Sequence, residues 1–290
     1  MRDVVVVGSA NLDLVASTPR LPAPGETVTG DAYTEYAGGK GLNQAIAAGR
    51  AGADVALVAC VGRDSAAEHL LEVARLADID ITFVERSDHL PTGRALIMVD
   101  EEAENTIVVV PGANQEVTVA TIPTSRVVLA QLETPFESVV AAFDHGRANG
   151  SVTILNPAPA AHLPIELIAL SDIIVPNEHE LELIGEIDPL LAAGVQAVIV
   201  TRGSHGVTIT TAGRSHDSTT RAVPAIPVDA IDTTGAGDAF CGCLAAGLAA
   251  GLELDAAVRR AVAAGALATT VPGAVPSLPT TDQIDTLLNG

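Results

Sequence analysis

The residues from Asp232 to Asp238 place two carboxylates six positions apart, with a glycine-rich turn between them. The run that follows, 239–250, is small and apolar, which predicts a helix with Asp238 in its first turn. Free amides at a helix N-terminus attract anions, so residues 235–237 could stabilise a phosphoryl group that carries developing negative charge. Asp238 could remove a proton from an attacking hydroxyl. A capped helix after a loop is the alternative, and the rest of the chain must decide.

A second glycine-rich turn, residues 38–43, leads into a predicted helix from Gln44 to Ala51. The turn lacks the Ser or Thr that follows the lysine of a Walker A loop, and it does not match GxGxxG, which disfavours a Rossmann dehydrogenase. It offers a close backbone approach, the ammonium of Lys40 and the amide of Asn43, which suit a ligand rich in hydroxyls. Lys40 is the only lysine beside fourteen arginines, and this isolation favours a functional role.

Short apolar runs alternate with helical patterns, which predicts a parallel sheet in an α/β fold. The predicted strands lie at 3–9, 54–60, 126–131, 152–155, 172–175 and 197–201. Asn11 and Asp13 follow the first of these strands and Glu133 follows the third, at the strand ends where open sheets bind ligands. Simple turns and a solvated glutamate are the alternatives. Segments at about 11–36 and 91–110 are predicted to form a small β-sheet lid outside the main sheet.

The composition indicates a single α/β domain over residues 1–290, because 48% of the residues are apolar. Aromatic residues make up only 2% of the chain, so bases have no stacking platform, and the net charge of −21 opposes binding to nucleic acid or to an anionic membrane. Three cysteines, Cys60, Cys241 and Cys243, are expected to be buried and reduced rather than metal-bound. We expect a cytoplasmic protein that binds a small molecule and has no transmembrane span.

Two further stretches could bind phosphates and one could bind a cation. Asn177 and Glu180 fall one helical turn apart, so both could face a hydrated magnesium ion, although an N-capped surface helix is an equal alternative. The turn Thr201–Gly206 offers hydroxyls, amides and a positive charge to an anion, or is a plain hairpin turn. The loop Thr269–Ser277 is rich in Gly and Pro, and its unpaired carbonyls favour a hard monovalent cation.

Seven segments of the chain, in this order, resemble the ribokinase branch of the PfkB-type carbohydrate kinase family. They are Asn11–Asp13, Gly25–Gly30, Gly38–Asn43, Gln131–Glu133, Asn156–Ala160, Asn177–Glu180 and Asp232–Asp238. The resemblance covers essentially the whole chain. It implies a ribokinase-like three-layer sandwich with a central, mostly parallel sheet plus a small β-sheet lid, and a homodimer formed through that lid.

The resemblance also implies the role of each site residue. It assigns the sugar to Asn11, Asp13, Gly39, Lys40, Asn43 and Glu133, and the catalytic base to Asp238. It assigns the anion hole to Gly235, Ala236 and Gly237, and ATP to Asn177, Thr201, Arg202, Gly203, Ser204, His205, Gly206 and Gly237. Magnesium would be held through water near Asn177 and Glu180. An activating potassium ion would be held by Asp232, Thr234, Ala268, Val271, Gly273 and Ser277.

The sequence therefore leads to the hypothesis of ATP-dependent phosphorylation of D-ribose at its 5-hydroxyl. A relative that acts on another pentose, a ketohexose or a nucleoside is the nearest alternative, and a non-catalytic sugar-binding protein on the same fold is the second. Two features depart from the family pattern. The segment between Gly185 and Ala197 is short and is predicted to lack a helix, and Val262 replaces a polar residue expected near adenine.

Overall fold

A computed structural model describes residues 1–102, 104–213 and 218–290 of the chain, which form two sheets and the helices around them. The larger sheet has nine strands and the smaller has four. In spatial order the nine strands are β13 (Ser218–Val223), β12 (Val207–Ala212), β11 (Ala197–Thr201), β10 (Ile173–Ile174), β9 (Val152–Leu155), β8 (Ser125–Ala130), β1 (Arg2–Val7), β4 (Val55–Val61) and β5 (Val84–Arg86). Neighbours from β11 to β5 are parallel, and β12 and β13 continue the sheet antiparallel.

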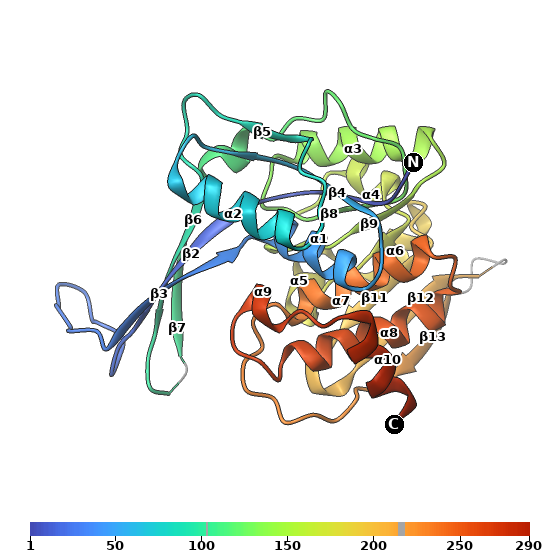
Figure 1. Cartoon of the computed structure of the whole chain (residues 1–290). Helices are drawn as coiled ribbons and strands as arrows, with labels where there is room; N and C mark the ends of the chain where they lie inside the picture. Colours follow the sequence, from blue (N-terminus) through green and yellow to red (C-terminus); the bar gives the residue numbers. More distant parts are fainter. Residues whose placement is uncertain (103, 214–217) are drawn as a thin grey trace.

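Helices cover both faces of the nine-stranded sheet (Figure 1), which explains why its central strands are apolar on both sides. Val4 to Val7 of β1, for example, are fully buried. One face packs against α1 (Lys40–Arg50), α2 (Ser65–Leu76), α7 (Ala236–Ala249), α8 (Leu254–Ala268) and α10 (Thr281–Asn289). The other packs against η1 (Gly112–Glu116), α3 (Phe136–Ala148), α4 (Ile165–Leu170), α5 (Glu178–Ile184) and α6 (Ile187–Ala192). This is the three-layer ribokinase-like architecture that the sequence predicted.

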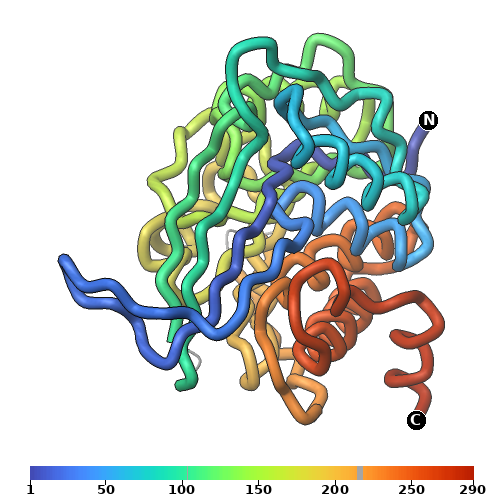
Figure 2. The backbone as a smooth tube through the Cα atoms, turned by 60° about the vertical axis from the view of Figure 1, so that its left-hand side comes forward, coloured from blue at the N-terminus to red at the C-terminus, as the bar shows by residue number. Residues whose placement is uncertain are grey.

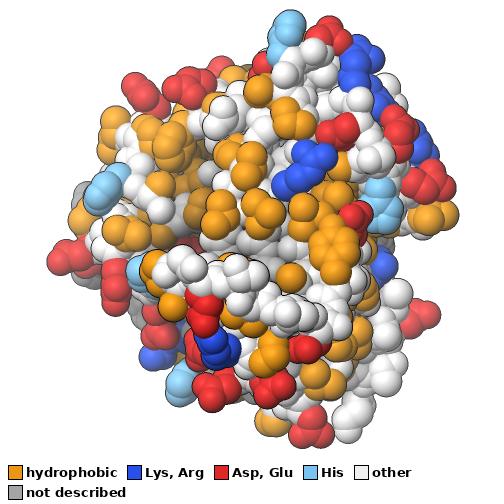
Figure 3. Space-filling model, turned by 90° about the vertical axis from the view of Figure 1, so that its left-hand side faces the viewer, with side chains coloured by type: hydrophobic (Ala, Val, Ile, Leu, Met, Phe, Trp, Pro, Cys, Tyr) orange, Lys and Arg blue, Asp and Glu red, His pale blue; other side chains and the backbone are white. Residues whose placement is uncertain are grey.

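The smaller sheet projects from the body as a lid (Figures 1 and 2). Its order is β3 (Ala32–Gly38), β2 (Asn11–Ser17), β6 (Gly93–Val99) and β7 (Asn105–Val110). The strand β2 pairs antiparallel with β3 and parallel with β6, and β6 pairs antiparallel with β7. Figure 3 views the molecule from the side of the lid and shows many hydrophobic side chains there. The first residues of β2 lie at the root of the lid, so Asn11 and Asp13 belong to both the lid and the body.

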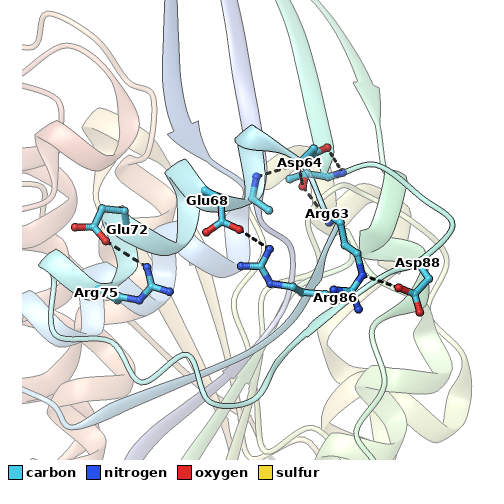
Figure 4. Close-up of polar contacts among 10 residues, drawn as sticks. Arg63, Asp64, Glu68, Glu72, Arg75, Arg86 and Asp88 are labelled. Atoms are coloured by element: carbon cyan, nitrogen blue, oxygen red, sulfur yellow. Dashed lines mark hydrogen bonds and ion pairs between the residues drawn. The ribbon is translucent and has the colours of Figure 1, made fainter.

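Asp64 connects the root of the lid to α2 (Figure 4). Its Oδ1 caps the helix by accepting a hydrogen bond from the amide of Ala67 at 3.0 Å, and it also accepts one from the Thr92 hydroxyl at 2.6 Å. Its Oδ2 accepts from the Thr92 amide at 3.0 Å and lies 3.4 Å from the Arg94 guanidinium. These bonds fix the start of β6. Ion pairs follow the outer side of α2, namely Arg63–Asp88, Arg86–Glu68 and Arg75–Glu72.

The helix α1 begins at Lys40, about one turn before its predicted start at Gln44. Glycine has low helix propensity, so the sequence pattern favoured a later start. The structure gives Gly41 a different role, because a Cβ atom there would lie 2.5 Å from the carbonyl carbon of Gly8 at the end of β1. Only glycine allows this close crossing of helix and strand. The crossing places Lys40, Asn43 and Gln44 in the first turns of α1, beside the carboxyl end of β1.

Two other expectations about local structure were wrong. The segment between Gly185 and Ala197 contains the six-residue helix α6, because Leu190 of the short segment still packs into the core. The loop after α8 includes a helical turn, α9 (Ala274–Ser277), although the sequence suggested only a loop shaped by Gly and Pro. Within the described ranges, no helix is long and apolar enough to cross a bilayer.

Candidate functional site

Asp238 lies where the N-terminal turns of α7 and α1 meet. The helix α7 begins at Ala236, after Gly235 in the left-handed conformation with φ 77°. Asp238 is therefore in the first turn, as predicted, and it is only 7% exposed. Its Oδ2 accepts a hydrogen bond from Nδ2 of Asn43, and its Oδ1 accepts one from Nε2 of Gln44, both at 2.9 Å. Two amide-to-carboxylate bonds thus join Asp238 to residues that lie 195 and 194 positions before it in the chain.

Lys40 supplies the positive charge of this centre. Burial lowers the pKa of its ammonium, but Asp238, Glu133 and Glu180 together raise that pKa more, so the group stays protonated. Burial raises the pKa of Asp238 above its ordinary value, while Lys40 and the Asn43 and Gln44 amides oppose that rise. The lone lysine of the chain therefore lies among three carboxyl groups, where its positive charge offsets their negative charges.

Glu133 lies just after β8 and is fixed by Ser9, which follows β1, and by the first turn of α1. One of its oxygens, Oε2, accepts hydrogen bonds from the Ser9 hydroxyl and from the backbone amide of Lys40, the latter at 3.1 Å. The Ser9 hydroxyl also accepts from the amide of Gly41 at 3.3 Å. Glu133 is thus a bonded side chain rather than a freely solvated glutamate, and its carboxylate lies beside the first turn of α1.

Asp13 has a carboxyl group whose pKa is raised to about 7. Burial is the largest cause, and the negative charges of Glu133 and Asp238 add to it. The carboxyl group packs over Gly38, since a Cβ atom at Gly38 would lie 2.1 Å from Oδ2 of Asp13. The glycine of the second turn therefore makes room for an acidic side chain from the lid.

Asn11 is held by Asn114, a residue that the sequence analysis did not identify. Nδ2 of Asn114 donates to Oδ1 of Asn11 at 2.7 Å, and Oδ1 of Asn114 accepts from the amide of Ala10 at 2.9 Å. Because a backbone N–H can only donate, the orientation of the Asn114 amide is determined, and the Asn11 oxygen must face it. The Nδ2 group of Asn11 is then the end that remains to donate to a ligand.

The amides of the predicted anion hole are only partly free. The N–H of Ala236 donates to the carbonyl of Thr233 at 3.3 Å, because the turn closes on itself before the helix begins, so the prediction of three free amides was too generous. Within residues 1–102, 104–213 and 218–290, the N–H groups of Gly235 and Gly237 have no protein acceptor. These two amides remain available at the positive end of α7.

A cavity of about 620 Å³ lies on the other side of this turn. Among the residues predicted to bind ATP, those that line it are Thr201, Gly203, Ser204, Gly206 and Gly237. The remaining wall is mostly apolar and comes from the segment 225–228, Phe240, Val262, Gly265 and Ala266. Of the described residues that were predicted with them, Asn177, Arg202 and His205 are not part of the wall. The turn residues singled out from the sequence therefore lie at the polar end of this cavity, and most of the residues at its apolar end were not predicted.

Asn177 and Glu180 form a capping box at the start of α5, which was the alternative to a magnesium site. Oδ1 of Asn177 accepts from the Glu180 amide at 2.7 Å, while the two Glu180 oxygens accept from the amide and side chain of Asn177 at 2.8 and 2.9 Å. Burial raises the pKa of Glu180. Arg202 points its Nε at Glu178 of the same helix, 2.9 Å away. Among the described residues, no cluster of three or more His, Cys, Asp and Glu could hold a metal ion.

Asp232 joins the anion turn to the loop after α8. Its Oδ1 accepts from the Thr234 amide at 2.9 Å and its Oδ2 from the Gly273 amide at 2.7 Å. Burial raises the pKa of Asp232, but these hydrogen bonds lower it by more, so the net pKa is below its ordinary value. Of the other residues predicted to bind potassium, Ala268 is buried at the end of α8, Val271 is exposed, and the Ser277 hydroxyl donates to Ala274. The structure thus brings Asp232, Thr234 and Gly273 together by direct bonds.

Three buried amides behind Asp238 were also missed as site residues, namely Gln44, Gln131 and Asn156. They are linked to one another and to Asp238 by hydrogen bonds of 2.6 to 3.0 Å. A usable signal was present, because each is an uncharged polar residue in or beside an otherwise apolar helix or strand. Buried polar groups need partners, so three of them in separate core elements indicate a shared network.

The comparisons with known proteins agree with this architecture. The family model described as pfkB family carbohydrate kinase matches residues 1–281. The chain is 38% identical to a ribokinase of Haemophilus influenzae over 97% of each chain, and 33% identical to a deoxyribokinase of Salmonella typhi over 99% of each. A ribokinase of Arabidopsis thaliana, solved with ribose and ATP, superposes with a TM-score of 0.89 at 29% identity, covering 99% of this chain and 98% of that one. The chain belongs to the pfkB family of carbohydrate kinases and is a ribokinase-type sugar kinase, a phosphotransferase with an alcohol acceptor.

Proposed function

We propose that the protein transfers the terminal phosphoryl group of ATP to the 5-hydroxyl of D-ribose. The observation that carries this proposal is the turn shared by the two halves of the site. Gly237 lines the 620 Å³ cavity, and the next residue, Asp238, points into the polar centre around Lys40. A nucleotide in the cavity and a sugar in the polar centre would therefore meet at this turn.

In this proposal Asp238 orients the 5-hydroxyl and removes its proton during transfer. The amides of Gly235 and Gly237 stabilise the negative charge on the transferring group, and Ala236 contributes only if its bond to Thr233 opens. Both actions come from one helix N-terminus, so the attacking oxygen and the phosphorus are positioned by the same rigid element. In-line transfer needs this alignment more than it needs covalent chemistry from the protein.

The polar centre suits a neutral sugar that carries several hydroxyls. Lys40, Nδ2 of Asn11 and the amide of Asn43 supply donors, while Asp13 and Glu133 supply acceptors. Gly39, the residue before α1, allows the backbone to approach the ligand closely. A site with this many paired polar groups rejects ligands that lack the matching hydroxyls. The Arabidopsis ribokinase was solved in complex with ribose and ATP, which supports this choice of substrates.

The nucleotide half is assigned to the turn from Thr201 to Gly206 and to the apolar wall that contains Val262. Thr201, Gly203, Ser204 and Gly206 would contact the phosphates and ribose of ATP, with the positive charge of Arg202 and the imidazole of His205 nearby. Magnesium usually keeps several waters and takes only one or two protein groups beside phosphates. The Asn177–Glu180 pair fits that pattern, since its oxygens retain lone pairs for water, and the ion would neutralise the leaving diphosphate.

A monovalent cation fits behind the turn. Asp232 is anionic and ties the turn to the loop that contains Gly273, so an ion held there would order the anion hole without touching substrate. We assign potassium to Asp232 and to the backbone or side-chain oxygens of Thr234, Ala268, Val271, Gly273 and Ser277. Replacing Asp232 by Asn should reduce activation by potassium several-fold while Asp238 remains essential. A rate that is independent of potassium in the wild type would remove this assignment alone.

The lid supports a homodimer. Leu96 of β6 lies opposite Val108 of the edge strand β7, and both side chains are about half exposed, so they form an apolar surface on one face of the lid sheet. Ile107 and Val109 of β7 are about half exposed on the opposite face. A second copy of the chain would cover this surface. Sedimentation of the wild type as a dimer, and of Val108→Glu as a monomer, is the expected result; a monomeric wild type at micromolar concentration would contradict it.

A coupled assay tests the proposed activity directly. Ribose, 2-deoxyribose, fructose and adenosine are compared with and without potassium, and ADP release should be fastest with ribose. A preference for 2-deoxyribose would instead favour the activity of the Salmonella relative, and ADP release without sugar, or none at all, would contradict a sugar kinase. Asp238→Asn should lower turnover by about 10²–10⁴-fold and leave sugar binding by calorimetry nearly unchanged. Normal turnover in that variant would remove Asp238 as the base.

A further inference from the structure

A directed chain of side-chain amides leads from the backbone of the sheet to Asp238. It starts at the carbonyl of Val175, which can only accept and which receives Nδ2 of Asn156 at 3.0 Å. The opposite end of that amide, Oδ1 of Asn156, accepts Nε2 of Gln44 at 3.0 Å. Because the first acceptor is a backbone carbonyl, the orientation of the Asn156 amide is determined, and so is that of Gln44.

Gln44 uses its whole amide in this chain. The two protons on Nε2 go to Asn156 and to Oδ1 of Asp238, the latter at 2.9 Å. Its oxygen accepts Nε2 of Gln131 at 2.6 Å, so a second amide holds it from the opposite side. All of these residues lie in the core, and Gln44 and Gln131 are completely buried. A flipped Gln44 would face an oxygen toward the carboxylate and break three bonds at once.

We infer that Gln44, locked in one orientation by Asn156 and Gln131, is the positioning residue that aims the Asp238 carboxylate. The inference rests on the proposed role of Asp238 as the base. With Oδ1 bound to Gln44 and Oδ2 to Asn43, the carboxylate cannot rotate, and its remaining lone pairs point to a fixed place. Gln44 itself is separated from the sugar by Asp238, so it acts through the base rather than on the substrate.

The bond from Gln44 also bears on the charge of Asp238. The titratable groups that face this carboxylate are Lys40 from α1, Glu133 from the end of β8, Glu180 from α5, Asp13 from β2 and Cys241 from α7 itself. Three of these five groups are carboxylic acids, burial raises the pKa of the Cys241 thiol, and burial of Asp238 also favours its protonated form. A neutral donor fixed against Oδ1 therefore favours the ionised form that a base requires.

The test is the pH profile of kcat/KM in Gln44→Met, a variant of similar length that cannot donate. The base works in its ionised form, so losing a donor raises its pKa and moves the acidic limb of the profile to higher pH. We expect a move of about one pH unit, the effect of losing one hydrogen bond to a charged group, and a fall in kcat of about tenfold. Gln131→Met should move the limb in the same direction by less, because Gln44 can still donate to Asp238 but no longer has the Gln131 hydrogen bond that fixes its orientation.

The matched control is Gln196→Met. Gln196 donates to the carboxylate of Asp172 at 2.7 Å, and both residues lie at the amino ends of β10 and β11, at the opposite end of these strands from the site. The Gln196→Met variant should therefore leave the pH profile unchanged. If Gln44→Met loses stability in thermal unfolding, the Gln131→Met profile decides in its place. An acidic limb that stays in position in both variants would overturn the inference, whereas a wild type without sugar-dependent ADP release would overturn the proposed function instead.

Discussion

The sugar half and the nucleotide half of the site meet at one turn, yet they are built from different parts of the chain. Around Asp238 the groups are buried or partly buried side chains, and several of them are fixed by another side chain, as the bonds of Asn11 to Asn114 and of Glu133 to Ser9 show. The cavity beyond Gly237 is lined instead by glycines, by hydroxyls and by small apolar residues.

This difference has a consequence for how the two halves tolerate change. A fixed side chain in a buried network cannot be removed without leaving its partners unpaired, which costs more than the bond itself is worth. A wall of backbone and small apolar groups has few side chains to lose, and it is sensitive mainly to added volume. Substitutions that delete a group should therefore be severe in the sugar half and mild in the nucleotide half.

Among the substitutions that compare the two halves, the largest effect is expected for Lys40→Met, which keeps most of the side chain and removes the charge. The cation that faces Asp238, Glu133 and Glu180 would then be lost, so the pKa of Asp238 would rise further. We expect kcat/KM for the sugar to fall by about 10²–10³-fold, as for the loss of one preorganised charge-stabilising group. The remaining activity should show its acidic limb at higher pH. An unchanged limb with a small fall in rate would show that the lysine is dispensable.

A smaller effect is expected from adding volume to the nucleotide half. Val262 is part of the apolar wall, and Val262→Phe would fill space in the cavity. We expect the KM for ATP to rise by about tenfold, since overpacking costs about 1–3 kcal/mol, while the KM for the sugar stays the same. Val262→Ala is the matched control and should change the KM for ATP by less than about threefold. An equal rise in both KM values would mean that the halves are not separate.

The same contrast explains which parts of the site could be predicted from the sequence. The glycine-rich turns were found because glycine in a tight turn before an apolar run has a direct local meaning, and the parallel sheet was found because its strands are continuous apolar runs. The order and type of the main elements followed from these signals. The capping box of Asn177 and Glu180 is equally local, but the sequence could not separate it from a magnesium site, because the same spacing serves both.

The sequence marks the buried amides as polar residues in apolar elements, but it could not assign their hydrogen-bond partners, for a physical reason. Gln44, Gln131 and Asn156 lie in three different elements, and only the crossing of α1 over the sheet brings them together. The apolar wall of the cavity was missed for the opposite reason, since Ala225 to Val228 look like any loop until the fold closes around them. Local patterns predict turns and caps, whereas networks and walls depend on tertiary contacts.

A third prediction concerns stability rather than rate. The pKa of Asp13 is about 7 in the folded chain and about 3.8 in the unfolded one, so the folded state binds more protons between those values. The carboxyl group therefore destabilises the fold as the pH rises from about 4 to about 7. We expect Asp13→Asn to raise the Tm at pH 8 by about 3 °C, equivalent to about 1 kcal/mol, with no gain at pH 3. Sugar affinity should fall in the same variant, and a Tm lowered at pH 8 would contradict the destabilisation assigned to the ionised Asp13 carboxyl group.

The smallest effect is expected for Arg202→Met, the counterpart of Lys40→Met in the nucleotide half. The guanidinium of Arg202 is exposed and already paired with Glu178 at 2.9 Å, and exposed ion pairs contribute about 0–1 kcal/mol. The KM for ATP should therefore rise by no more than about threefold, with kcat and the sugar KM unchanged. A coupled assay at low and high salt checks this, because a charge that steers phosphates weakens with ionic strength. If the KM for ATP instead rises tenfold or more, Arg202 leaves Glu178 to bind the nucleotide, and this half of the site depends on a side chain as strongly as the sugar half does.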